Sequence, residues 1–347
     1  MKVRSTDGPK REATLANLGI DGIDALVREF NERRPRGLAR AISWAESGRG
    51  AELVRRLYPR TGHAMTIGLT GPPGVGKSTL SSAIVRKART LGKTVGVISV
   101  DPSSPFSHGA LLGDRIRLTE HFVDPDVFIR SMASRGHLGG VSGATADAVL
   151  LMDAFGLDVI LIETVGVGQS EIEIAELAQT TLVALQPGSG DSIQVLKAGI
   201  MEIADIFVVN KSDHPMANQM RREIRGMMEM LQFSGWVPEL VMTQALLGDG
   251  IDDLWRAIES HLVYLNESGE IESKRREAFA HQVRQLALGR LQKRLEREIQ
   301  ANVRTEIDPY AAADAVLEGF GDASADGAPE AEVPLLHPRA MVKGLTT

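Results

Sequence analysis

The stretch Gly71-Pro72-Pro73-Gly74-Val75-Gly76-Lys77-Ser78-Thr79 fits the phosphate-loop pattern G-x-x-x-x-G-K-[ST]. The apolar run 65–69 before it predicts a strand, and the stretch 79–89 after it predicts a helix. This strand–loop–helix order allows backbone N–H groups to converge on phosphate oxygens at a helix N-terminus. We expect Lys77 to reach the β- and γ-phosphates and Ser78 to place its hydroxyl on Mg²⁺. The context therefore favours a nucleotide site over a surface turn rich in Gly and Pro.

Strands alternate with helices from His63 onward. The apolar runs 93–100, 158–162, 181–185 and 206–209 read as strands, 127–130 as a short strand and 144–154 as a helix. This alternation predicts an α/β fold of the P-loop NTPase type, with a doubly wound and mostly parallel sheet. Such sheets bind ligands at the carboxyl ends of their strands. The loops after these strands should therefore carry the chemistry.

A second motif, Asn210-Lys211-Ser212-Asp213, directly follows the strand 206–209. In that position N-K-x-D selects guanine over adenine. The Asp213 carboxylate can accept hydrogen bonds from both N1–H and the exocyclic amino group of guanine. Adenine lacks this pair of donors and would leave the carboxylate unpaired, which is costly in a buried site. The motif predicts that the nucleotide is GTP.

Carboxylates at the ends of neighbouring strands predict the metal side of the site. Glu163 ends the strand 158–162, Asp101 ends the strand 93–100, and Asp114 is a third candidate. A carboxylate beside a phosphate loop can hold Mg²⁺ directly or through water, while Gly166 can offer its N–H to the γ-phosphate. The predicted catalytic residues are Lys77, Glu163 and Asp101, and the predicted Mg²⁺ ligands are Ser78, Asp101, Asp114 and Glu163.

Two questions about hydrolysis stay open at this level. Asp114 is equally interpretable as a helix-entry charge paired with Arg115 or Arg117. Gln169 follows Gly166 by three residues, whereas a water-positioning Gln would be adjacent to it. With no evident arginine finger, we expect slow intrinsic hydrolysis unless a partner supplies or orders a group.

Composition limits the classes of partner. The 347 residues carry a formal net charge of -6, which gives no global field favouring nucleic acid or an anionic membrane. The absence of cysteine excludes disulfides, iron–sulfur clusters and thiolate metal sites. No apolar run approaches membrane-spanning length, so we expect a cytoplasmic protein.

The chain divides into four expected parts. Residues 1–60 form an N-terminal helical extension, 61–265 the phosphate-loop domain, 266–317 a C-terminal helical arm and 318–347 a disordered tail rich in Gly, Ala, Asp and Pro. A turn-rich joint is expected at 266–270. An apolar stripe from Phe279 to Ile299 follows the arm. Such a stripe is buried either against the chain's own domain or in a contact between subunits.

Taken together, several motifs resemble the MeaB/ArgK family of GTPases, the chaperones of adenosylcobalamin-dependent acyl-CoA mutases. The similar segments are 70–79, 100–104, 112–117, 135–140, 163–171 and 197–205, and the similarity extends to Asp308-Pro309-Tyr310. This combined set is far more specific than the phosphate loop alone.

The resemblance implies a domain of the class that includes signal-recognition and metallocentre-assembly GTPases (SIMIBI), with a C-terminal arm that makes a homodimer. It implies Mg²⁺ with GTP or GDP and no organic cofactor of the protein's own. The implied function is loading and protection of a mutase such as methylmalonyl-CoA mutase, with the cobalamin adenosyltransferase as a further partner. Switch segments are implied at 101–114, 163–170 and 186–197. The loop Gln244-Ala245-Leu246 is implied to offer backbone N–H groups to guanine O6.

Some positions depart from the family pattern. His108 stands where Gly is usual, Gln179 where Asp is usual and Gln244 where Ser is usual, and the sequence after Leu317 is unlike the family. These differences fit either neutral drift or a paralogue that serves a different acyl-CoA mutase.

Three other classes of protein share parts of this pattern. A GTPase that inserts nickel is disfavoured because the chain has no cysteine and only eight scattered histidines. An ATP-dependent transport kinase is disfavoured by the motif 210–213. A regulatory GTPase without a cofactor role stays open.

Overall fold

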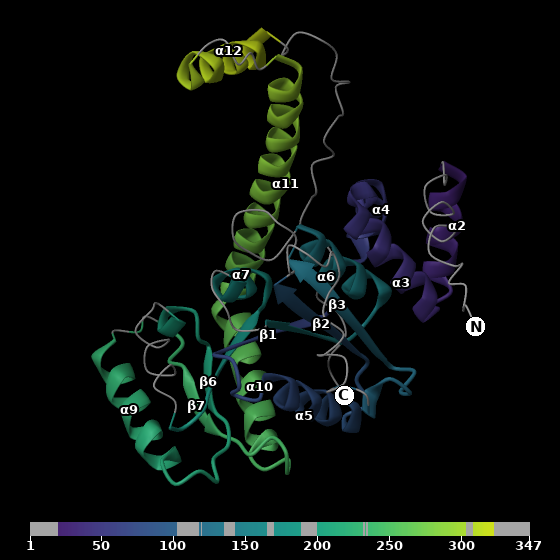
Figure 1. Ribbon diagram of the computed structural model, residues 1–347. Helices are drawn as coiled ribbons and strands as arrows, with labels where there is room; N and C mark the ends of the chain where they lie inside the picture. Colours follow the sequence, from purple (N-terminus) through teal and green to yellow (C-terminus); the bar gives the residue numbers. More distant parts are fainter. Residues whose placement is uncertain are drawn as a thin grey trace, which may run out of the picture. The chain divides into compact units, whose positions relative to one another are not determined.

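A computed structural model describes residues 20–102, 118, 120–134, 143–164, 170–188, 200–231, 233, 235–302 and 308–322. The chain divides into two compact units, Met1–Gln285 and Leu286–Thr347. The first unit contains a seven-stranded sheet of order β3-β2-β4-β1-β5-β6-β7, in which every neighbouring pair is parallel (Figure 1). The strands are β1 Met65–Thr70, β2 Val95–Pro102, β3 Val127–Ser134, β4 Val159–Thr164, β5 Thr180–Leu185, β6 Ile206–Val209 and β7 Glu239–Met242. The predicted α/β class and parallel sheet are confirmed.

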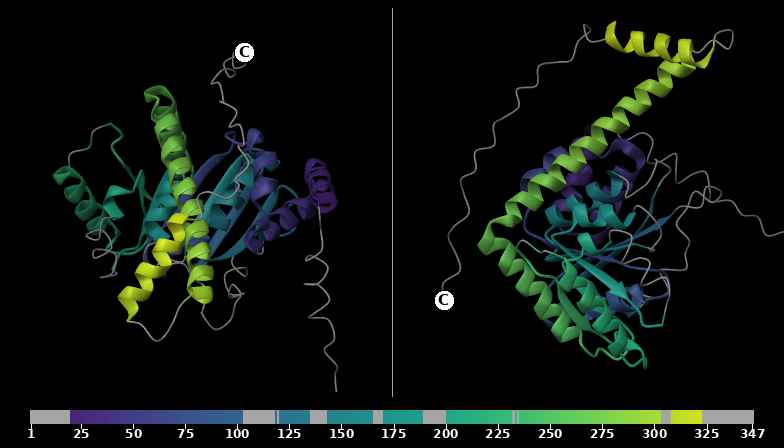
Figure 2. Two further views of the ribbon diagram at one scale, coloured as in Figure 1. Left: turned by 90° about the horizontal axis from the view of Figure 1, so that it is seen from above. Right: turned by 90° about the vertical axis from the view of Figure 1, so that its left-hand side faces the viewer.

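Helices cover both faces of this sheet (Figure 2). Strand β4 shows why: Val159 and Leu161 enter one apolar core, and Ile160 and Ile162 enter the other. A strand with alternate side chains buried on both faces must be apolar throughout, as the run 158–162 predicted. The helices of this unit are α2 Ile20–Asn31, α3 Pro35–Trp44, α4 Ala51–Leu57, α5 Lys77–Thr90, α6 Gly143–Phe155, α7 Ser170–Leu177, α9 Ala217–Met230 and α10 Ile251–Ser268.

The two faces are covered by different helices. The first core joins α5 and α10 to the strands, for example through Leu80 and Leu254. The second joins α2, α3 and α4 to α6 and the strands, and Phe30 meets Phe155 edge to face with ring centroids 5.2 Å apart. The N-terminal helices therefore pack on the sheet domain. A third core lies between α9 and the strands β5 and β6.

The C-terminal helices differ from expectation in two details. Helix α10 continues to Ser268 and α11 spans Glu270–Asn302, so the expected turn-rich joint is reduced to Gly269 at φ 77°. Glycine reaches this left-handed conformation without a Cβ penalty, and it ends helices for that reason. Helix α12 spans Pro309–Asp322, so its last residues are helical where the sequence suggested the start of a tail. Residues 323–347 lie outside the described part.

The base of α11 is fastened to the sheet domain. Lys274 donates to Asp205 Oδ2 at 3.0 Å and to the carbonyl oxygen of Gln179 at 2.9 Å. Asp205 also contacts His261 Nε2 at 3.3 Å, and burial lowers the pKa of His261 to about 4. These contacts lie at the amino ends of β5 and β6, away from the phosphate loop. No helix in the described residues is long and apolar enough to span a membrane.

Candidate nucleotide-binding site

The phosphate loop connects β1 to α5 at the carboxyl edge of the sheet, where the strand order reverses around β1. Two of its glycines are required by geometry. Gly71 has φ 141°, and a Cβ there would lie 2.1 Å from the carbonyl oxygen of Ala184 on β5. Gly76 has φ 91°, and its Cβ would lie 2.8 Å from Asn210 Nδ2. The loop is therefore wedged between its own helix and the neighbouring strand segments.

The side chain of Lys77 is buried within this loop. Its ammonium donates to the carbonyl oxygens of Gly71 at 2.7 Å and Pro72 at 3.0 Å. Val75 is fully buried in the first apolar core, which anchors the loop, while Pro73 and Gly74 are exposed and Thr79 is half-buried. The loop thus holds the Lys77 ammonium beside exposed backbone at a helix N-terminus, an arrangement suited to binding phosphate.

Glu163, at the carboxyl end of β4, meets the first turn of α5. Its Oε1 accepts from Ser78 Oγ at 2.7 Å and its Oε2 accepts from Ser81 Oγ at 2.7 Å. The carboxylate is 7% exposed. In the register of β2 and β4, Ser99 lies opposite Glu163, so Asp101 lies two residues further along at the same edge. Nothing is described of the Asp101 side chain, and Asp114, Gly166 and His108 lie outside the described residues.

The donor set fits Mg²⁺. A serine hydroxyl and a buried carboxylate in contact are hard oxygen ligands, and Mg²⁺ is usually held by one or two such groups together with water and substrate phosphates. In the part of the chain that the structure describes, no group of three or more His, Cys, Asp or Glu side chains could hold a metal alone. The Ser78 hydroxyl and the Glu163 carboxylate fit a Mg²⁺ ion that shares its coordination with nucleotide phosphates.

Asn210 connects three segments at the other end of the site. Its side chain is 3% exposed and donates to the carbonyl oxygen of Val75 at 2.9 Å. Its Oδ1 accepts from Thr243 Oγ1 and from the Ala245 N–H, both at 3.2 Å. One buried amide therefore ties the phosphate loop to the end of β7 and to the loop Gln244-Ala245-Leu246.

Lys211 and Asp213 flank this amide at the surface. Lys211 has φ 56°, unusual for a residue with a Cβ, and its ammonium donates to the Gly74 carbonyl at 2.9 Å and to Gln186 Oε1 at 2.6 Å. The Asp213 side chain is exposed, as is Leu246. The structure therefore brings the phosphate loop, the 210–213 motif and the 244–246 loop together.

The loop containing Gln244 is a tight turn. The Gln244 carbonyl accepts from the N–H groups of Leu247 and Gly248, both at 3.0 Å. Gly250 closes the turn at φ 74°, where a Cβ would lie 2.1 Å from the Met242 carbonyl oxygen. These contacts use the backbone of Gln244, so a different side chain there leaves the turn intact.

Gln179, another departure from the family pattern, lies away from this site. Its Oε1 accepts from the Thr66 N–H at 3.3 Å and its Nε2 donates to the Ala64 carbonyl at 3.4 Å, both near the amino end of β1. It fastens the entry of the central strand and does not touch the phosphate loop.

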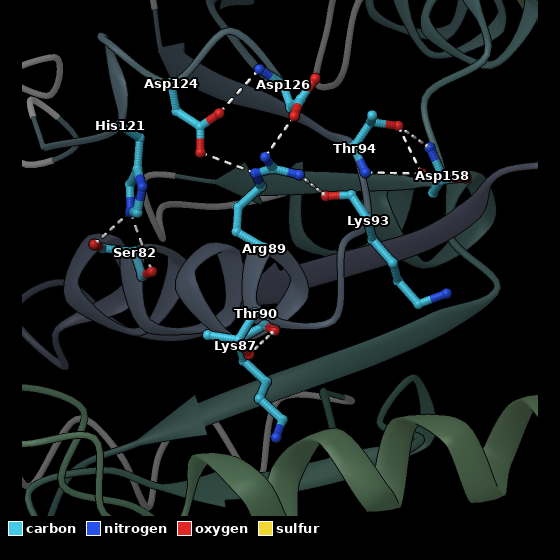
Figure 3. Close-up of polar contacts among 10 residues, drawn as sticks. All are labelled: Ser82, Lys87, Arg89, Thr90, Lys93, Thr94, His121, Asp124, Asp126 and Asp158. Atoms are coloured by element: carbon cyan, nitrogen blue, oxygen red, sulfur yellow. Dashed lines mark hydrogen bonds and ion pairs between the residues drawn. The ribbon is translucent and has the colours of Figure 1, made fainter.

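Polar contacts hold α5 in place along its length (Figure 3). Arg89 donates to Asp124 at 2.9 Å, to Asp126 at 2.6 Å and to the Lys93 carbonyl at 2.7 Å, and its hydrogen bond lowers the pKa of Asp124. Nearer the site, His121 Nε2 lies 2.9 Å from Ser82 Oγ. The segment before β3 therefore braces the helix whose first turn carries Lys77 and Ser78.

Ser81 is a site residue that the sequence motifs did not identify. Ser81 follows Ser78 by three residues, a spacing that places both on one face of a helix, so this signal was present in the sequence. Gln186, the first residue of the implied switch 186–197, directly follows β5, the strand beside the phosphate loop, but its contact with Lys211 was not predicted.

Comparisons with known proteins agree with this geometry. The family model described as "Methylmalonyl Co-A mutase-associated GTPase MeaB" matches residues 38–300. A putative GTPase of Pyrococcus horikoshii is 44% identical over 309 residues, covering 85% of this chain and 98% of that protein. The mouse mitochondrial protein named methylmalonic aciduria type A homolog is 38% identical over 307 residues, covering 79% of this chain and 74% of that protein. The crystal structure of a LAO/AO transport system kinase, 24% identical, covers 88% of this chain and all of its own with a TM-score of 0.65, which shows a shared fold.

Proposed function

The chain belongs to the family of the methylmalonyl Co-A mutase-associated GTPase MeaB and is a GTPase, and from this premise we propose that it is a chaperone of an adenosylcobalamin-dependent acyl-CoA mutase. In this proposal GTP binding and hydrolysis assist the loading of adenosylcobalamin into a mutase such as methylmalonyl-CoA mutase and protect the loaded enzyme. The family match across residues 38–300 is the observation that carries it. The name of the mouse relative supports the same process.

We assign the nucleotide to the edge of the sheet around β1. Lys77 would exchange its two carbonyl acceptors for β- and γ-phosphate oxygens. These oxygens are charged and therefore form stronger hydrogen bonds with an ammonium than neutral carbonyl oxygens do. Asp213 would accept from guanine N1–H and the amino group, and the 244–246 loop would offer backbone N–H to O6. Asn210 keeps these two ends at a fixed separation, so that one nucleotide can reach both.

The metal side of the assignment uses Ser78 and Glu163, with Asp101 and Asp114 as further ligands. Mg²⁺ bound there with the nucleotide would neutralise charge that develops on the phosphate oxygens. Two serine hydroxyls hold Glu163 in place, so little movement of this carboxylate would accompany cation binding.

The segments that would respond to the nucleotide begin at strands around β1. The proposed switches start at Asp101 on β2, at Glu163 on β4 and at Gln186 directly after β5. In the strand order β2-β4-β1-β5 these starts surround the phosphate loop. A mutase that contacts this edge could therefore read the presence of the γ-phosphate, and by ordering the segments it could accelerate hydrolysis.

The C-terminal arm is proposed to make a homodimer. On α11 itself the apolar stripe stays exposed: Phe279 is 52% exposed, Val283 48% and Leu291 52%. Exposed apolar stripes of this kind usually mark a contact with another protein. We propose residues 266–317 as the dimerisation arm and 61–265 as the nucleotide domain, with the cobalamin adenosyltransferase as a further partner.

The test is hydrolysis in the presence of the mutase. Purified protein with GTP and Mg²⁺ is assayed alone, with cobalamin-free methylmalonyl-CoA mutase, and with a cobalamin-independent isomerase as a control. We expect the mutase, and not the control isomerase, to raise kcat for GTP hydrolysis at least about tenfold. Ordering a catalytic group in a GTPase can raise kcat by far more than that. The Lys77→Ala protein should neither hydrolyse GTP nor support cofactor transfer. If no cobalamin-dependent acyl-CoA mutase binds the protein or alters the rate, the chaperone proposal fails.

A further inference from the structure

Ser81 has a role that no motif assigns. It lies on α5 one turn after Ser78 and is 0% exposed. Its hydroxyl donates to Glu163 Oε2 at 2.7 Å, while the Ser78 hydroxyl donates to Oε1 of the same carboxylate at 2.7 Å. Two serines on one helix face therefore hold the two oxygens of a buried strand-end carboxylate.

Ligand binding would affect the Ser78 and Ser81 hydrogen bonds to Glu163 differently. A cation bound beside the phosphates would take a lone pair of the Ser78 hydroxyl, and the hydrogen bond from Ser78 to Glu163 would then change. Ser81 lies one turn deeper and is fully buried, so its hydroxyl stays on Oε2. The hydrogen bond on Oε2 would restrict rotation of the carboxylate and favour the orientation in which Oε1 faces the side of the site where Ser78 lies.

We propose that Ser81 is a positioning residue for Mg²⁺: it fixes Glu163 so that Oε1 is presented to the cation or to one of its waters. The inference rests on the nucleotide and metal assignment made above. Partners of metal ligands commonly set ligand orientation, and their loss typically costs about 10- to 100-fold in metal affinity.

A purely structural serine would look different. A serine inside a helix usually donates back to the carbonyl four residues earlier or points to solvent. Ser81 instead donates across to another element, onto a group of the site. Its neighbour Ser82 provides the contrast, because its buried hydroxyl contacts Glu120 and His121 and does not touch Glu163.

The experiment compares Ser81→Ala with Ser82→Ala, two equal deletions at adjacent buried positions of one helix. Each full-length protein is saturated with a non-hydrolysable GTP analogue and titrated with Mn²⁺, a paramagnetic substitute for Mg²⁺. Free Mn²⁺ is measured by electron paramagnetic resonance. Affinity for the analogue is measured separately in EDTA.

For Ser81→Ala we expect the Kd for Mn²⁺ to rise about 10- to 100-fold, with unchanged nucleotide affinity in EDTA. For Ser82→Ala we expect both to match the parent. GTP hydrolysis by Ser81→Ala should recover at high Mg²⁺, because the defect is in metal affinity. Equal affinities for Mn²⁺ in the two variants would overturn the inference. A Ser81→Ala protein whose affinity for the nucleotide analogue falls by the same factor with and without metal would also overturn it. No mutase is present, so these results are independent of the chaperone test.

Discussion

The substitution Asn210→Ala probes the contact that unites the two halves of the site. The side chain makes three hydrogen bonds, to the Val75 carbonyl, Thr243 Oγ1 and the Ala245 N–H, and is 3% exposed. Alanine would leave a backbone carbonyl and a backbone N–H without partners inside the domain. A buried polar group left unpaired costs about 1–3 kcal/mol, and partial relaxation makes the costs less than additive.

We therefore expect Asn210→Ala to lower the free energy of unfolding by about 3 kcal/mol in the absence of nucleotide. That is a large share of the roughly 5–15 kcal/mol that stabilises a domain. Nucleotide binding should weaken as well, because the base loop and the phosphate loop lose their shared tether. Urea unfolding followed by circular dichroism measures the first effect, and calorimetric titration with GDP measures the second.

The matched control is Asp213→Asn, three residues further along the chain. That side chain is exposed, so the free energy of unfolding should stay within about 0.5 kcal/mol of the parent. If Asn210→Ala unfolds at the same urea concentration as this control, the amide does not join the segments in solution. The three buried hydrogen bonds of Asn210 would then contribute no measurable stability.

Three further changes test separate parts of the site and fold. Asp213→Asn should weaken GTP binding and shift the preference toward xanthine nucleotides in competition assays; unchanged GTP affinity would count against the base assignment. Lys77→Ala should abolish hydrolysis in a phosphate-release assay, and normal turnover would remove Lys77 from the site. Burial on α6 raises the pKa of Asp147 to about 6 in the folded state, because burial disfavours the ionised carboxylate. The free energy of unfolding therefore falls as pH rises from the unfolded-state pKa through the folded-state pKa. Asp147→Asn should therefore raise the free energy of unfolding by about 1–3 kcal/mol at pH 8 and by much less at pH 4, and an equal change at both pH values would contradict it.

The parts of this protein that could be predicted from sequence are those carried by short, contiguous patterns. The phosphate loop and the 210–213 motif each contain their chemistry within a few residues, and the apolar run 158–162 identifies a strand buried on both faces. Edge strand β7 escaped because it is short and only partly buried, so its pattern is weak. The joint was predicted to span 266–270, longer than the single residue Gly269, because the polar residues at the end of α10 resemble a turn.

Contacts between residues far apart in the chain could not be predicted from the sequence. Asn210 and Val75 are separated by 135 positions, and only the folded sheet brings them together. His261 appeared as one of several scattered histidines. In the structure its Nδ1 lies 2.9 Å from Thr180 Oγ1, and it is buried as a neutral ring beside Asp205. Ser81 belongs to the same group, since its importance depends on Glu163 lying opposite.

If one guanine nucleotide binds at the carboxyl edge around β1, between Lys77 and Asp213, calorimetry can show it directly. Purified protein in Mg²⁺ is titrated separately with GDP and with ADP. We expect one GDP bound per chain and no measurable uptake of ADP. No heat with guanine nucleotides, or equal binding of ADP, would mean that no guanine-specific site lies there.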